Sequence, residues 1–130
     1  MILIVEDHPM VRSTLREWLS PAFAHCQFHE AVSGEEAVEL AAANAPAIVV
    51  MDVGLPKING IEAARIIKAR SPRTRIIMLS IQEALAYVED AQAAGASAYI
   101  SKRKMAAELI PAVQKLLAEW QAEADPSAVS

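Results

Sequence analysis

Polar side chains that can do chemistry stand where the apolar segments of this 130-residue chain end. The segments end in turn at Glu6-Asp7, Asp52, Ser80 and Lys102. Carboxylates that are brought close together repel, so each resists ionisation unless a cation joins them. Mg²⁺ is a hard cation that prefers such oxygen ligands. The three carboxylates therefore predict a metal-assisted site.

The hydroxyl and the ammonium in this set indicate what the site would act on. Ser80 and Lys102 suit the oxygens of a phosphoryl group. Asp52 would be the nucleophile toward phosphorus, with the metal neutralising charge. The expected product is an aspartyl phosphate, which is a reactive mixed anhydride.

Each of these residues also has a simpler explanation. Asp7 can start a turn, and Glu6 can be a solvated strand end. Ser80 can cap a helix, since serine is favoured there. Lys102 can be one of three basic surface residues in a row. The combined site is preferred because the simpler explanations require independent coincidences at the ends of four strands.

The elements that must position these residues alternate along the chain. Apolar runs predict strands over residues 2–6, 27–32, 47–52, 75–80 and 97–101. Helical periodicity begins at Pro9 and should stop near Ser20-Pro21, because proline disfavours helix in the residue before it. Further helices are expected over 34–43 after a Ser33 cap, over 60–70, over 83–94 and around 109–120.

Five strand–helix units predict an α/β fold with a parallel sheet and helices on both faces. The first, third and fourth strands are the most apolar, so they should be central. This predicts a flavodoxin-like, doubly wound (βα)5 domain with strand order 2-1-3-4-5. The carboxyl-terminal ends of all strands then lie on the same side of the molecule, which brings the polar residues together.

Length and composition bound the possibilities further. We expect one domain over residues 1–121 and a linker or tail over 122–130, which is small, polar and interrupted by proline. The net charge of -4 argues against nucleic-acid binding by a basic face. No apolar stretch approaches the ~20 residues of a membrane span. The single cysteine, Cys26, fits a reducing compartment, so the expected location is cytoplasmic.

The chain resembles receiver domains of two-component response regulators over about residues 1–120. The matching motifs are Glu6-Asp7, Asp52 followed by Leu55-Pro56 and Gly60, Ser80, and Ala94-Gly95-Ala96 leading to Tyr99 and Lys102. Asp7-His8-Pro9 and Gly60-Ile61-Glu62-Ala63 are most similar to the subfamily with a C-terminal helix-turn-helix DNA-binding domain.

The resemblance implies a role for each matching residue. Asp52 would accept phosphate from a sensor histidine kinase or a phosphotransfer protein. Lys102 would pair with the phosphoryl group, and Ser80 and Tyr99 would be the switch residues. Mg²⁺ would be held by Asp7, Asp52, the backbone carbonyl of Gly54 and, through water, Glu6. Such a chain is a signalling domain whose only catalysis is its own phosphorylation and dephosphorylation.

Two residues depart from the family pattern. Ile81 is larger than the residue that often follows the switch serine, which predicts slowed phosphotransfer or dephosphorylation. Arg103 follows Lys102 where many receivers have proline, and the sequence leaves open whether that peptide bond is cis. His8 beside the carboxylates is interpreted as a turn residue rather than a metal ligand.

Other function classes fit the sequence less well than the receiver. A Mg²⁺-dependent phosphatase or phosphotransferase would need a second acid-base residue and a cap over its substrate. A flavin carrier would need a phosphate-binding loop where Glu6-Asp7 stands. Within the receiver class, one alternative is a single-domain protein acting through partners. The other, which we prefer, is the first part of a transcription regulator, with homodimerisation or release of a DNA-binding domain as the output.

Overall fold

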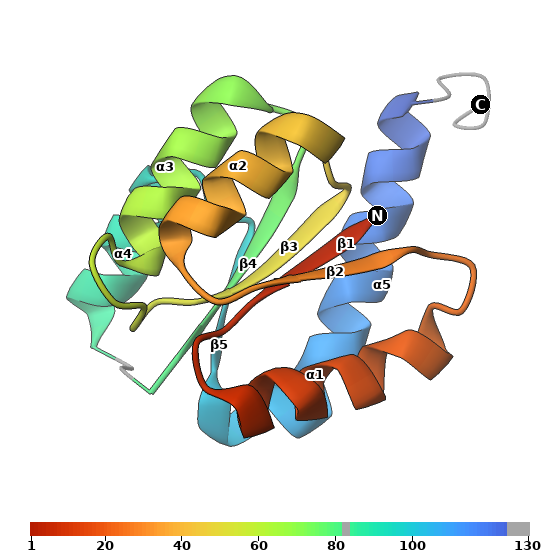
Figure 1. The fold of residues 1–130 in the computed structure, drawn as a ribbon, viewed down its shortest axis with the longest axis horizontal. Coiled ribbons are helices and arrows are strands. Elements are labelled where there is room, and N and C mark those ends of the chain that lie inside the picture. The colour runs from red at the N-terminus through yellow and green to blue at the C-terminus, as the bar shows by residue number, and fades with distance from the viewer. Residues whose placement is uncertain (82–83, 125–130) are drawn as a thin grey trace.

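The apolar runs of the sequence form a five-stranded parallel sheet (Figure 1). The structure is a computed structural model and describes residues 1–81 and 84–124. Its strands are β1 (Ile2–Val5), β2 (Phe28–Ala31), β3 (Ile48–Asp52), β4 (Arg75–Ser80) and β5 (Ala98–Ser101). They lie in the order β2-β1-β3-β4-β5, which confirms the predicted topology.

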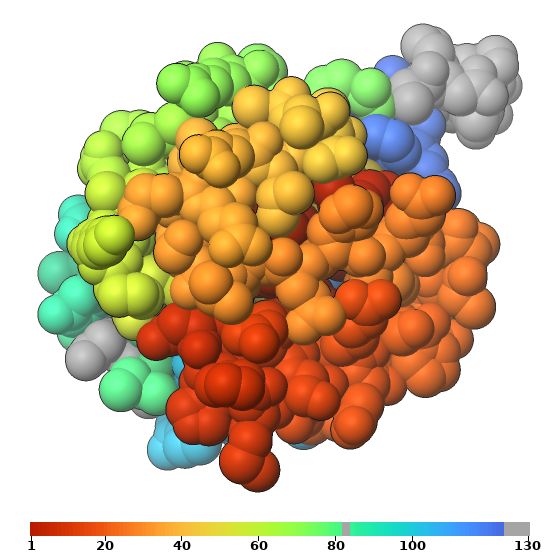
Figure 2. Space-filling view, in the orientation of Figure 1, coloured from red at the N-terminus to blue at the C-terminus, as the bar shows by residue number. Residues whose placement is uncertain are grey.

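Helices cover both faces of the sheet (Figure 1). One face carries α2 (Gly34–Asn44), α3 (Gly60–Arg70) and α4 (Leu85–Ala93), and the other carries α1 (Pro9–Ala22) and α5 (Met105–Ala124). Side chains alternate along β1, so Leu3 and Val5 enter the first core and Ile2 and Ile4 enter the second. Figure 2 shows β1 almost hidden behind later segments of the chain. Burial on both faces explains why the central strands are apolar throughout.

Side-chain caps fix where two of the helices begin. The Ser33 hydroxyl accepts a hydrogen bond from the Glu36 amide at 3.1 Å, as the sequence predicts. Asn59 caps α3 in the same way, with its side-chain oxygen 2.9 Å from the Glu62 amide. The predicted span of α3 is confirmed at both ends.

The predicted end of α1 is wrong. The helix continues through Pro21 to Ala22, and the Phe23 amide closes it on the Leu19 carbonyl at 2.9 Å. Pro21 has no amide hydrogen, so the helix lacks the backbone hydrogen bond that this position would donate four residues back. Leu19 and Phe23 are both buried in the second core, and their burial holds this turn in place.

Other boundaries differ from the prediction by a few residues. The strands β1, β2 and β5 are each shorter, so Glu6 follows β1 rather than ending it. Helix α4 begins at Leu85, and the predicted start at residue 83 lies outside the described residues. Gly95, the predicted cap, follows α4 with a φ of 101°. Helix α5 runs to Ala124, so residues 122–124 are helical, and the division between domain and linker stays a prediction.

The end of α5 is tied to the start of β4. Arg73 donates a hydrogen bond to the Trp120 carbonyl at 3.1 Å, and its guanidinium lies 4.7 Å from the centre of the Trp120 ring. Arg75 forms an ion pair with Glu123. Within the described ranges, all peptide bonds are trans, including the one between Lys102 and Arg103. In that same part of the chain, no helix combines the length and apolarity needed to cross a membrane.

Candidate functional site

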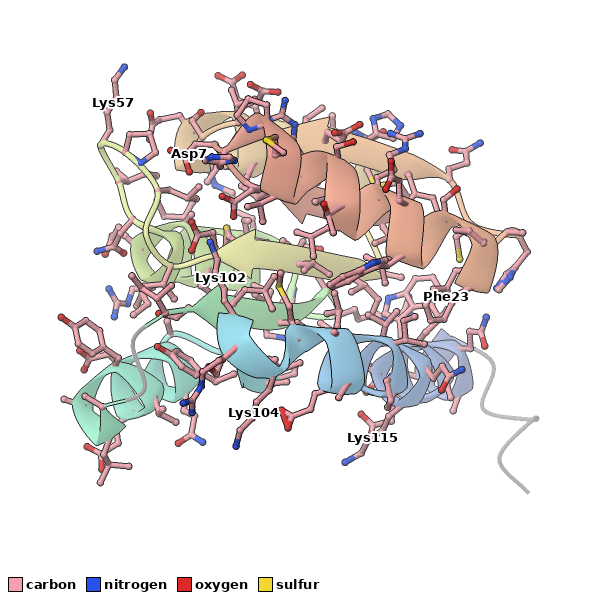
Figure 3. The ribbon with its side chains drawn as sticks, turned by 90° about the horizontal axis from the view of Figure 1, so that it is seen from below. Asp7, Phe23, Lys57, Lys102, Lys104 and Lys115 are labelled. Atoms are coloured by element: carbon pink, nitrogen blue, oxygen red, sulfur yellow. The ribbon has the colours of Figure 1, made fainter. Side chains whose placement is uncertain are left out.

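Parallel register brings the predicted site residues to one edge of the sheet. Val5 pairs with Met51, Asp52 with Leu79, and Ser80 with Ser101. The residues at or just after these positions therefore come together, as expected for an open α/β sheet. Figure 3 shows Asp7 and Lys102 at the same end of the molecule, with Phe23 at the other end.

Three carboxylates form the acidic part of the site. Glu6, Asp7 and Asp52 each place a carboxylate oxygen within 4.8 Å of the others. Glu6 is 1% exposed and Asp52 is 7% exposed, whereas Asp7 is open to solvent. Burial, together with the neighbouring Asp52 carboxylate, raises the pKa of Glu6, and Lys102 opposes this shift. The oxygen-only donor set and its concentrated negative charge fit a hard divalent cation.

Lys102 lies between two of these carboxylates. Its Nζ is 3.3 Å from Glu6 Oε2 and 3.3 Å from Asp52 Oδ2. A short 3₁₀ turn over Lys102–Lys104 places the lysine directly after β5. If all four side chains are ionised, the three carboxylates and the ammonium carry a net formal charge of about -2. A divalent cation would neutralise that charge.

The backbone around Asp52 fixes the direction of its side chain. Asp52 Oδ1 accepts a hydrogen bond from the Gly54 amide at 3.1 Å, so one oxygen is held while Oδ2 meets Lys102. Gly60, the first residue of α3, packs against this strand. A Cβ at Gly60 would lie 2.2 Å from the Asp52 carbonyl oxygen, so only glycine fits there.

A pocket of about 320 Å³ opens over Asp52. The residues lining it come from the ends of β3, β4 and β5 and from α4: Asp52, Val53, Gly54, Ser80, Ile81, Tyr87 and Lys102. A carboxylate, a buried hydroxyl and an ammonium thus line one space. This set suits a phosphoryl group bound at the carboxylate.

A family model described as "Response regulator receiver domain" matches residues 2–114. This chain is a receiver domain of the response-regulator family. It is similar to the transcriptional activator protein ExaE of Pseudomonas putida, with 38% identity over 117 residues, covering 90% of this chain and 55% of that protein. Response regulator UvrY of Escherichia coli strain K12 is 33% identical over 115 residues, covering 88% of this chain and 53% of that protein.

A solved structure agrees with these relatives. The crystal structure of a LuxR-family two-component response regulator from Aurantimonas sp. SI85-9A1 is 36% identical, with a TM-score of 0.82. The match covers 91% of this chain and 84% of that one. The receiver domain spans about half the length of the curated relatives it matches, and one of them, ExaE, is named as a transcriptional activator.

The aromatic side chain that lines the pocket of the receiver domain is Tyr87, which the sequence reasoning missed. Tyr99, the predicted switch aromatic, is half-buried against the first core and lines a neighbouring pocket of about 300 Å³ with Val88 and Glu108. Tyr87 lies in an alanine-rich helix of low hydrophobic contrast. Its position depends on how α4 packs beside β4, which no local pattern indicates.

The structure also bears on two interpretations made from the sequence, those of His8 and Ser80. The Nδ1 atom of His8 accepts a hydrogen bond from the Val11 amide at 3.4 Å, and the His8 amide faces Glu6 Oε1 at 3.3 Å. His8 therefore caps α1, in agreement with the predicted turn role. Ser80 does not cap α4, because the residue at that cap is Ala84.

Proposed function

We propose that this receiver domain is a phosphorylation-activated switch with Asp52 as the phosphoacceptor. The observation that supports this most directly is the position of the Asp52 carboxylate, which pairs with Lys102, lies beside the Glu6 and Asp7 carboxylates and lines a pocket. The phosphoryl donor would be a phosphohistidine of a sensor histidine kinase or of a phosphotransfer protein.

The chain's own residues would prepare and stabilise the transfer. The Gly54 amide and Lys102 orient the two Asp52 oxygens toward the pocket. One oxygen forms a bond to phosphorus while the phosphorus–nitrogen bond of the donor breaks. Lys102 then pairs with the oxygens of the incoming phosphoryl group, and the buried Ser80 hydroxyl donates to one of them.

Mg²⁺ is the proposed cofactor. Glu6, Asp7, Asp52 and the backbone carbonyl of Gly54 would hold it. When bound, it would supply positive charge that offsets the repulsion between the carboxylates and the phosphoryl oxygens.

The output would be control of transcription by the longer protein. ExaE is named as a transcriptional activator and UvrY as a response regulator, and each is about twice the length of the matched region. We infer that a DNA-binding domain follows this chain and that phosphorylation alters homodimerisation or the release of that domain. Ser80 and Tyr99 would transmit the change, because the phosphoryl group stabilises one arrangement of the end of β4 over another.

Phosphorylation of a single carboxylate is directly testable. The receiver domain is incubated with acetyl phosphate and Mg²⁺, and its intact mass is measured. We expect one phosphate adduct that is lost in Asp52→Asn and without the metal. Asp90→Asn, the same substitution at an exposed carboxylate on α4, should keep the adduct. An adduct that persists in Asp52→Asn, or none with any small phosphodonor, would refute the proposal.

A further inference from the structure

The pocket over Asp52 has a buried end and an exposed end. Asp52 and Ser80 are 7% and 2% exposed, whereas Ile81 and Tyr87 are 78% and 41% exposed. All four residues line the same space. The exposed end of the pocket is therefore lined by Gly54, one branched aliphatic side chain and one aromatic ring.

The pocket is larger than a phosphoryl group alone requires. A volume of about 320 Å³ corresponds to roughly ten water molecules. In phosphoryl transfer the attacking and leaving atoms lie roughly in line on opposite sides of phosphorus. Since Asp52 attacks from the buried end, the leaving group must lie at the exposed end, where Ile81 and Tyr87 stand.

Tyr87 is suited to one kind of leaving group. An aromatic side chain contacts another flat ring favourably through stacked or edge-to-face packing. The leaving group of a phosphohistidine is an imidazole ring, whereas that of acetyl phosphate is a small carboxylate. Among the described residues that line this pocket, Tyr87 is the one aromatic.

We propose that Tyr87 determines the donor specificity of this receiver domain by contacting the imidazole ring of a phosphohistidine. This rests on the proposed phosphorylation of Asp52. During transfer an Asp52 oxygen bonds to phosphorus and the phosphorus–nitrogen bond breaks, leaving its electron pair on the ring nitrogen. The reacting donor is the form protonated at the other ring nitrogen, so neutral imidazole departs and no further reactant is needed.

Two small phosphodonors separate this role from a structural one. Monophosphoimidazole carries the ring, and acetyl phosphate lacks it. Phosphorylation rates with each donor and Mg²⁺ are measured by intact mass for the receiver domain and for Tyr87→Ala. We expect the rate with monophosphoimidazole to fall roughly twofold to tenfold, the range that ring contacts contribute, while the rate with acetyl phosphate changes little.

Two further variants test whether the change in rate depends on the aromatic ring of Tyr87. Tyr87→Phe keeps the ring and should keep the ratio of the two rates. Leu85→Ala removes an exposed apolar side chain from the same helix, outside the pocket, and should also leave the ratio unchanged.

The possible failures are distinguishable. An equal fall with both donors would assign Tyr87 a structural role, and no change with either would show that it does not meet the ring. Both results overturn this inference and leave Asp52 as the phosphoacceptor. Absence of any adduct on the unsubstituted protein would instead refute the proposed function, and this inference with it.

Discussion

Lys102 joins two buried carboxylates in the receiver domain, and this contact changes how the site should be understood. Glu6 and Asp52 would repel strongly in a buried setting if no cation lay near them. The ammonium at 3.3 Å from both lowers that cost but leaves the cluster negative. A phosphoryl group on Asp52 would compete with Glu6 for the same ammonium. The lysine is therefore placed to respond to modification of its neighbour.

Ile81 gives a prediction at the level of a single side chain. It lines the pocket over Asp52 and is 78% exposed, so it lies at the solvent side of the proposed phosphorylation site. Ile81→Ala should speed both phosphorylation by acetyl phosphate and loss of the phosphoryl group by a few-fold, because access widens. Phosphorylation is followed by intact mass in the presence of acetyl phosphate, and loss of the phosphoryl group is followed after the donor is removed.

Met10→Ala is the matched control for this change. Met10 is 75% exposed on α1 and does not line the pocket, so its removal should leave both rates as they were. Unchanged kinetics in Ile81→Ala would show that the isoleucine does not restrict access.

The sequence predicted which residues gather around Asp52 better than it predicted the outer lining of the pocket. Asp52, Ser80 and Lys102 could be predicted because parallel strands all end at one edge, whatever the details of packing. The lysine's contact with Glu6 could not, since it depends on side-chain torsions after β5. Tyr87 was missed because its place in the pocket depends on the docking of a whole helix.

Among the connections between helices and strands, the one from α3 to β4 is held by hydrogen bonds from a single lysine side chain. Lys68 Nζ donates to the carbonyl oxygens of Pro72 at 2.7 Å and Thr74 at 2.9 Å. Burial, with a smaller effect of Arg75, lowers the pKa of Lys68 below its usual 10.5. The folded state therefore releases this proton more readily than the unfolded state does.

This shift predicts a dependence of stability on pH. At neutral pH, Lys68→Met should lower the free energy of unfolding by about 1 kcal/mol through loss of the two hydrogen bonds. The charged amine also costs folding free energy below its folded pKa, and this cost disappears as the pH rises toward 10.5. Relative to Lys68→Met, the unsubstituted protein should therefore gain stability with rising alkaline pH.

Urea unfolding of both proteins from neutral pH to about 10.5 measures this difference. Lys115→Met, which removes an exposed lysine from α5, controls for the loss of one positive charge. A relative stability that stays constant or declines over this range would contradict the predicted direction.

Local signals predicted some elements more closely than others. The ends of α3 and the cap of α2 follow from neighbouring residues, so they could be predicted. The end of α1 could not, because buried Leu19 and Phe23 outweigh the local preference set by Pro21. Helix α4 buries one of its nine residues, Ala91, and its cap residue Ala84 makes no side-chain hydrogen bond. Because so few of its side chains are buried, the sequence of α4 shows little hydrophobic periodicity.

Across the whole molecule, the carboxyl-terminal ends of the strands differ from their amino-terminal ends in what they hold. The former hold the candidate site, and the latter hold the contacts between the start of β4 and the end of α5. Strand β4 runs from Arg75 to Ser80, so this one strand connects the amino-terminal end of the sheet with the carboxyl-terminal end. A shift at the phosphorylated end would therefore have a continuous packed route to the last turns of α5.

Arg73→Ala tests whether these contacts hold the end of α5. The variant loses the hydrogen bond to the Trp120 carbonyl and the contact with its ring, worth about 1 kcal/mol together. Amide hydrogen exchange over residues 118–124 should then become roughly fivefold faster, as read by mass spectrometry.

Arg70→Ala removes an arginine from the adjoining end of α3 and should leave this exchange unchanged. Equal exchange in Arg73→Ala and the unsubstituted protein would show that the end of α5 is held by its other contacts.

The same geometry has a practical consequence for engineering. The carbonyl of Met1 accepts a hydrogen bond from the Ala47 amide just before β3 begins, so the amino end of the chain lies at the edge away from Asp52. The last turns of α5 lie at that edge too, beside Arg73 and Arg75. A fluorophore, an affinity handle or a fused reporter attached at either point would leave the acidic rim uncovered. Surface immobilisation through these points would present the proposed phosphoacceptor to solution in a defined orientation.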